Sequence, residues 1–151
     1  MIKEIYHVGL SVSDIDRSID FYKNILGLEF QGEILMEGEA TDKLFNRPNS
    51  RCRVAYLNGS KEVMAPPVEL ICFLDQSLDE NKASLFKPSI SEICFRVNDI
   101  DKVYKHLIDN GVECLSAPQE FDFSKSGFSK SKALYFKDPD GIILELMESL
   151  D

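Results

Sequence analysis

The chain has 151 residues, 44% of them hydrophobic and 28% charged, a composition typical of one globular domain or of two small ones sharing a core. Lys and Arg number 17 against 26 Asp and Glu, so the net charge is −9. This charge disfavours nucleic acid and anionic membranes as partners, but one inward-facing Arg could still attract an anionic small substrate. No apolar run approaches the roughly 20 residues of a membrane span, and the charged N-terminus lacks a secretory core. We therefore expect a cytoplasmic protein.

The first predicted elements are a strand over residues 7–12 and a helix that follows the motif Asp-Ile-Asp at 14–16. Apolar residues at 8, 10 and 12 predict one face packed on a helix-covered core, which places His7 and the residues at 9 and 11 on the other face. Apolar residues then recur at helical spacing up to Gly27, a residue type that commonly ends helices.

The rest of the first half contains two further predicted strands and a region with few strand signals. Residues 32–50 are interpreted as a long loop with a short helix at 42–45, because glycine, proline and mixed charges interrupt any alternation. Strands are predicted around 54–57 and 67–70, with an Asn-Gly turn at 58–59 after the first. In the second of these strands Glu69 lies between two large apolar residues.

The second half repeats this pattern. Residues 92–101 (EICFRVNDID) match residues 7–16 (HVGLSVSDID), and a helical stretch again ends at a glycine, Gly111. Residues 133–136 and 143–146 match the two later strands, and Glu145 matches Glu69. Residues 118–131, rich in Ser, Lys and Phe, are predicted to be flexible. We therefore predict an α+β fold of two strand–helix–strand–strand–strand modules, 1–74 and 89–151, joined by a linker at 75–88.

Four polar residues occupy equivalent inward positions of the repeat: His7, Glu69, Glu92 and Glu145. A buried carboxylate without a partner is costly, and a divalent cation at a common centre would satisfy all four. Structural alternatives remain for each: an ordinary histidine, a solvated edge-strand acid at Glu145, or a Glu92 paired with Arg53 or Arg96. The residues alone do not choose between them.

These segments, with the terminal motif Asp-Pro-Asp-Gly-x-x-x-Glu-Leu at 138–146, resemble the vicinal oxygen chelate superfamily, which includes glyoxalase I, methylmalonyl-CoA epimerase, extradiol dioxygenases and bleomycin-resistance proteins. The resemblance covers nearly the whole chain. It implies two βαβββ modules whose sheets curl around a metal cleft, with helices outside. It also implies one divalent ion (Zn, Ni, Mn, Co, Fe or Mg) held by His7, Glu69, Glu92 and Glu145. Glyoxalases and epimerases usually have His where this chain has Glu92, and three carboxylates favour harder ions.

The same resemblance implies a lyase or isomerase of glyoxalase I type that moves a proton next to a carbonyl through an enediolate or enolate. Glu145 and Glu69 would be the candidate bases. Arg96 and Arg53 are the candidate substrate-binding residues, and a homodimer is expected. Two alternatives stay open: a metal-free protein that binds a drug or metabolite, and an extradiol-type dioxygenase. The dioxygenase is disfavoured because it needs two histidine ligands and the chain offers only His7.

The four cysteines, Cys52, Cys72, Cys94 and Cys114, lie about twenty residues apart in apolar runs. Zinc knuckles and thioredoxin-like sites need closely spaced pairs, which are missing from the sequence. Free thiols buried in the core are therefore predicted.

Overall fold

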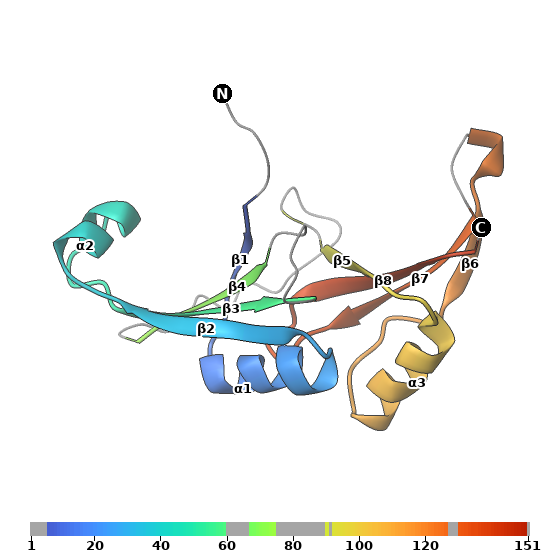
Figure 1. The fold of residues 1–151 in the computed structure, drawn as a ribbon, viewed down its shortest axis with the longest axis horizontal. Coiled ribbons are helices and arrows are strands. Elements are labelled where there is room, and N and C mark those ends of the chain that lie inside the picture. Colours follow the sequence, from blue (N-terminus) through green and yellow to red (C-terminus); the bar gives the residue numbers. More distant parts are fainter. Residues whose placement is uncertain (1–5, 60–66, 75–89, 91, 127–129, 151) are drawn as a thin grey trace. The chain divides into compact units, whose positions relative to one another are not determined.

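The structure is a computed structural model that describes residues 6–59, 67–74, 90, 92–126 and 130–150 (Figure 1). The chain divides into two compact units, Met1–Glu80 and Asn81–Asp151. The linker predicted at 75–88 lies outside the described residues. Within the described part of the chain, none of the helices is both long and apolar enough to cross a membrane.

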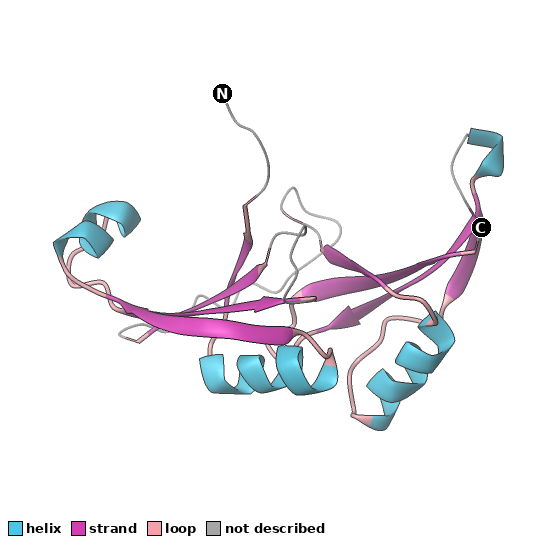
Figure 2. Cartoon of the chain, in the orientation of Figure 1, coloured by secondary structure: helices cyan, strands magenta, loops and turns pink. Residues whose placement is uncertain are grey.

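Unit 1 is a four-stranded mixed sheet with a helix packed on one face. Its elements in chain order are β1 (Val8–Ser11), α1 (Ile15–Asp20) continuing into the π-helical turn η1 (Phe21–Ile25), β2 (Glu29–Met36), α2 (Glu39–Phe45), β3 (Cys52–Asn58) and β4 (Val68–Phe73). The strand order is β1-β4-β3-β2, with β1 parallel to β4 and the other pairs antiparallel. Leu10, Leu57 and Leu70 are buried on the face that α1 covers (Figure 2).

Unit 2 repeats this architecture, and its described residues have a short 3₁₀ turn in the place that α2 takes in unit 1. Its elements are β5 (Ile93–Arg96), α3 (Ile100–Asp109), β6 (Gln119–Asp122), the short 3₁₀ turn η2 (Ser124–Ser126), β7 (Lys130–Lys137) and β8 (Ile143–Ser149). The strand order β5-β8-β7-β6, with β5 parallel to β8, is the same as in unit 1. The prediction of an α+β fold with two βαβββ modules is therefore confirmed.

The repeated motif Asp-Ile-Asp builds the same helix start in both units. Asp14 accepts a hydrogen bond from the backbone N–H of Arg17 at 3.0 Å, and Asp99 accepts one from Lys102 at 2.9 Å. Each side chain thus satisfies a donor that the first helical turn leaves free. At the other end Gly27 and Gly111 have positive φ angles of 75° and 72°, which confirms their prediction as helix-ending residues.

Each unit also ties its helix to its sheet with an ion pair at an equivalent position. Arg53 on β3 contacts the Asp16 carboxylate at 2.8 and 3.0 Å, and Lys132 on β7 contacts Asp101 at 2.8 Å. Both acids are the second Asp of the motif. The repeat therefore extends from the backbone to the contacts that fix the helix on the sheet.

Two loop predictions were wrong. Residues 32–50 contain most of β2 and all of α2, and residues 118–131 contain β6. Strand β2 passes through Gly32 at a register shift, and most of its residues are exposed, so it shows no alternation of buried and polar positions. The Asp42 carboxylate of α2 accepts the backbone N–H groups of Asn49 and Ser50, which orders the return to β3. The short helix predicted at 42–45 is confirmed as the end of α2.

Candidate metal-binding half-sites

The strand register of unit 1 places three site residues on one face of its sheet. Two of them, His7 and Glu69, were predicted from the sequence, and the third, Tyr56, was not. Glu69 on β4 lies opposite Gly9 on β1 and opposite Tyr56 on β3. Partners that face each other across a ladder project from the same side, and His7 is two residues before Gly9. We call this side, opposite α1, the glutamate face of unit 1.

His7 and Glu69 meet there in a short contact. His7 Nε2 lies 2.7 Å from Glu69 Oε2, with the imidazole 39% exposed and the carboxyl side chain 9% exposed. Despite this distance, the buried Oε2 has no aligned hydrogen-bond donor among the described residues. A buried polar atom in this state normally costs about 1–3 kcal/mol. His7 Nε2 and Glu69 Oε2 are therefore close enough for an ion pair when His7 is protonated, but they are not aligned as a hydrogen bond.

Such a pair fits a divalent metal ion. Nitrogen and oxygen ligands lie about 2.1 Å from Zn²⁺, so two of them at a right angle are roughly 3 Å apart. The 2.7 Å separation of His7 Nε2 and Glu69 Oε2 is close to this value. Imidazole nitrogen and carboxylate oxygen are also a donor set common to the transition metals and Mn²⁺. The spacing and the chemistry of His7 and Glu69 therefore fit a shared divalent cation.

Tyr56 is the residue of this half-site that the sequence analysis missed. Its ring centroid lies 6.2 Å from that of His7 in an edge-on arrangement. Burial raises the pKa of the Tyr56 phenol above its usual value, and the charge of Glu69 raises it further. The phenol therefore stays protonated and can donate a hydrogen bond beside the carboxyl group. The repeated Tyr at the middle of the third strand in each half was the signal that could have identified it.

Unit 2 builds the equivalent half-site from other residue types. Glu145 on β8, 9% exposed, lies opposite Cys94 on β5 and Tyr135 on β7. Glu92 is two residues before Cys94, as His7 is two residues before Gly9. We call this side of the sheet, opposite α3, the glutamate face of unit 2.

The electrostatic effects within unit 2 show that these side chains influence one another. Partial burial of the thiol raises the pKa of Cys94 to about 12, and a hydrogen bond to Glu145 and the charges of Glu145 and Glu92 add to the shift. Burial and the same two carboxylates also raise the pKa of Tyr135. Cys94 thus lies beside Glu145 at the position that Gly9 occupies beside Glu69.

The four predicted ligands accordingly occur as two pairs, one in each unit. His7 contacts Glu69, and Glu92 lies two residues before Cys94, the direct register partner of Glu145. Within the described residues of either unit, no three His, Cys, Asp or Glu side chains form a group able to hold a metal on their own. Among the described residues of unit 2, no ion pair joins Glu92 to Arg96, and the pairing with Arg53 remains a prediction.

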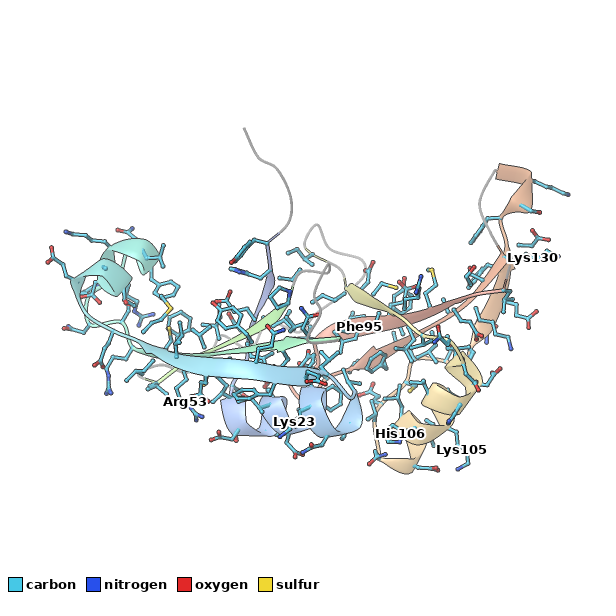
Figure 3. The ribbon with its side chains drawn as sticks, in the orientation of Figure 1. Lys23, Arg53, Phe95, Lys105, His106 and Lys130 are labelled. Atoms are coloured by element: carbon cyan, nitrogen blue, oxygen red, sulfur yellow. The ribbon has the colours of Figure 1, made fainter. Side chains whose placement is uncertain are left out.

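The two candidate substrate-binding arginines occupy different environments. Arg53 projects from the face of β3 that α1 covers, three residues before Tyr56, and contacts both Asp16 and Glu33 (Figure 3). The structure therefore does not bring Arg53 together with Glu69. Arg96 is exposed and follows Cys94 by two residues on the glutamate face of unit 2.

The prediction of four buried thiols was wrong for Cys94. Cys52 and Cys72 are buried and Cys114 is partly buried, whereas Cys94 is exposed. Cys94 is the register partner of Glu145 and so projects from the glutamate face of β5, opposite the side that packs on α3. All four cysteines are free thiols, as predicted.

The chain is thus a two-module α+β protein with a duplicated βαβββ fold. The glutamate face of one unit carries an imidazole and a carboxyl group, and that of the other carries two carboxyl groups. The chain belongs to the Glyoxalase/Bleomycin resistance protein/Dioxygenase superfamily, whose family profile matches residues 4–146. The resemblance inferred from the sequence is therefore confirmed.

Relatives over nearly the full length support this membership. The uncharacterized protein YraH of Bacillus subtilis is 29% identical over 147 residues, covering 97% of this chain and 99% of YraH. The metallothiol transferase FosB of Staphylococcus epidermidis is 32% identical over 148 residues, covering 97% of this chain and 84% of FosB. A crystal structure of a glyoxalase family protein from Bacillus cereus superposes with a TM-score of 0.84 at 22% identity, covering 100% and 97% of the two chains. The last similarity shows the shared fold.

Proposed function

We propose that the chain is a divalent-metal-dependent enzyme of glyoxalase type that transfers a proton at a carbon next to a carbonyl group. One ion per chain would be held by His7, Glu69, Glu92 and Glu145. The observation that carries this proposal is the 2.7 Å contact of His7 Nε2 with a Glu69 oxygen that has no hydrogen-bond donor. Family membership and the equivalent acid pair of unit 2 support it.

The ion would polarise adjacent oxygens of a small substrate and stabilise the negative charge that develops on them. The chain's own side chains would move the proton. Glu145 and Glu69 are the candidate bases, because both are largely buried carboxyl groups on the glutamate faces. Tyr56 and Tyr135, kept protonated by their raised pKa values, would orient these carboxyl groups by hydrogen bonding.

The ligand set predicts which ions bind. One imidazole with three carboxylates gives a formal charge of about −1 with a divalent ion, a harder site than one with two imidazoles. We expect Mn²⁺, Fe²⁺ and Mg²⁺ to bind well relative to Zn²⁺, and Glu92→His to shift the preference toward Zn²⁺, Ni²⁺ and Co²⁺.

The test of the proposal is metal analysis with matched variants. Protein purified without chelator, or reloaded with Mn²⁺, should contain about one ion per chain, and Glu145→Gln should lose both the ion and any turnover of a hemithioacetal or related carbon acid. Glu92→His should keep the ion. Arg53→Met, outside the glutamate face, is the control and should keep full metal content. A Glu145→Gln variant with undiminished metal content and activity would refute the assignment, and a wild-type chain that never binds metal would favour a metabolite-binding protein.

Transfer of a thiol to an electrophilic substrate is a second candidate function, because FosB, at 32% identity, is named a metallothiol transferase. The same ligands would serve both reactions. Loss of free cysteine or glutathione in the presence of an epoxide and the metal-loaded chain would indicate thiol transfer. Isomerisation of a hemithioacetal without net loss of thiol would indicate the glyoxalase-type reaction.

A further inference from the structure

The two glutamate faces differ in the residues that follow the proposed metal ligands. On the first strand of unit 1, Gly9 and Ser11 succeed His7 at alternate positions. On the first strand of unit 2, Cys94 and Arg96 succeed Glu92 at the same positions. Unit 2 therefore carries a cation where unit 1 carries a small hydroxyl group, although the surrounding backbone is the same.

Among the described residues of unit 2, three basic side chains have no ion-pair partner: Arg96, Lys102 and Lys125. Of these, Arg96 is the one that lies on a strand of the glutamate face, since Lys102 is on α3 and Lys125 is in η2. The acids nearest to it in sequence and register are already engaged: Asp99 accepts the backbone N–H of Lys102, and Glu148 accepts that of Ile100. By contrast, four lysines of this unit pair with carboxylates: Lys105, Lys130, Lys132 and Lys137.

The position of Arg96 relative to Glu145 follows from the strand register. Cys94 is the direct partner of Glu145, and Arg96 is one two-residue step further along β5, opposite Met147. Such a step is about 6.6 Å along a strand and keeps the side chain on the same face. Phe95, labelled in Figure 3, lies between the two and faces the α3 side with its partner Leu146. Arg96 thus extends over the glutamate face beside the carboxyl group proposed to move the proton.

We propose that Arg96 binds an oxyanion group of the substrate, a carboxylate or a phosphoryl group, several bonds away from the reacting carbon. This inference rests on the proposed function, because it takes Glu145 as the reacting end. A guanidinium donates two parallel hydrogen bonds to such a group, and this geometry distinguishes it from an uncharged end of similar size. The substrate class is then a small 2-hydroxy or 2-oxo acid with a second anionic group.

The alternative explanation is that Arg96 is a charge on an edge strand that prevents pairing with other sheets. That role needs a positive charge but no particular ligand. Ligand selectivity separates the two explanations.

The experiment compares three probes that share a 2-hydroxy acid group: malate, 3-phosphoglycerate and 2-hydroxybutyrate. Their dissociation constants are measured by NMR titration of ¹⁵N-labelled full-length protein, loaded with Mg²⁺ and metal-free, with metal content determined on the same samples. Wild type should bind malate or 3-phosphoglycerate about tenfold to a hundredfold more tightly than 2-hydroxybutyrate, and the tighter of the two identifies the anionic group. The NMR spectrum also reports whether each variant is folded.

Arg96→Met should abolish this preference and Arg96→Lys should retain part of it. Lys23→Met is the control: it removes the same charge on the helix side of unit 1, where Figure 3 labels Lys23, and should leave the preference intact. A wild type without preference, or an Arg96→Met variant that keeps it, overturns the inference. If an Arg96-dependent preference persists in a chain that binds no metal, the proposed function fails while the anion site stands; if metal binds without any preference, only the anion site fails.

Discussion

Replacing Glu69 by glutamine should change stability in opposite directions with and without metal. In the absence of metal, Glu69 Oε2 is a buried oxygen that faces His7 without a hydrogen-bond donor. Leaving such an atom unsatisfied costs roughly 1–3 kcal/mol. The amide of Glu69→Gln has nearly the same shape, carries no charge and can donate to His7 Nε2. We therefore expect the variant to be more stable than wild type by about 1 kcal/mol in EDTA.

Metal should reverse this order. An ion present at a hundred times its dissociation constant stabilises the folded chain by about 2.7 kcal/mol, and Glu69→Gln removes one of its ligands. Urea unfolding followed by far-UV circular dichroism measures both conditions, with EDTA and with excess Mn²⁺. Wild type should then be the more stable protein in Mn²⁺ and the less stable protein in EDTA.

Glu145→Gln is the internal control, because Glu145 occupies the equivalent position but, unlike Glu69, has no oxygen that is both buried and without a hydrogen-bond partner among the described residues. It should lose the stabilisation by metal without gaining stability in EDTA. The reasoning is refuted if Glu69→Gln is less stable than wild type in EDTA, or if Mn²⁺ stabilises Glu69→Gln as much as wild type. Either result would mean that the contact with His7 is a structural pair.

Further predictions concern the ion pair of unit 1 and the exposed thiol of unit 2. Arg53→Met should lower the unfolding midpoint at neutral pH, because the guanidinium bridges Asp16 and Glu33. Hydrogen bonding to Arg53 lowers the pKa of Asp16 below 3.8, so this stabilisation is present above that pH and is lost as the pH falls through the lowered value; thermal melts of the two proteins should therefore converge in acid. Cys94, with a pKa of about 12, should react with iodoacetamide at pH 8 at least about a hundredfold more slowly than a model thiol, and Glu145→Gln should accelerate the reaction measured by mass spectrometry.

The sequence predicted the fold where local chemistry repeats itself. The alternating strands at 7–12 and 92–97, the motif Asp-Ile-Asp and the glycines after each helix all specify the same local structures in both halves, and the structure confirms them. Strands β2 and β6 were missed for a physical reason. Most residues of β2 and all of β6 are exposed, so neither strand has the alternation of apolar and polar residues that marks a half-buried strand.

The candidate site was predictable only in part. Alternation placed His7 and Glu69 on one face, and the structure brings them within 2.7 Å. The same rule, applied to β3, would have put Arg53 on the face opposite Tyr56, where the structure pairs it with acids near α1. Which carboxylate an arginine contacts depends on the register of neighbouring strands and the position of the helix, and the local sequence does not specify either.

The duplication gives both units one backbone, so the residues that depart from the repeat must account for any difference between the two half-sites. Gly9 places no side chain beside Glu69, whereas the matching Cys94 places a thiol beside Glu145. Glu69 already contacts a second candidate ligand, His7 Nε2, at 2.7 Å, which suits it to a fixed position beside a cation. Between the two candidate bases, this asymmetry favours Glu145 for the proton and Glu69 as a fixed ligand.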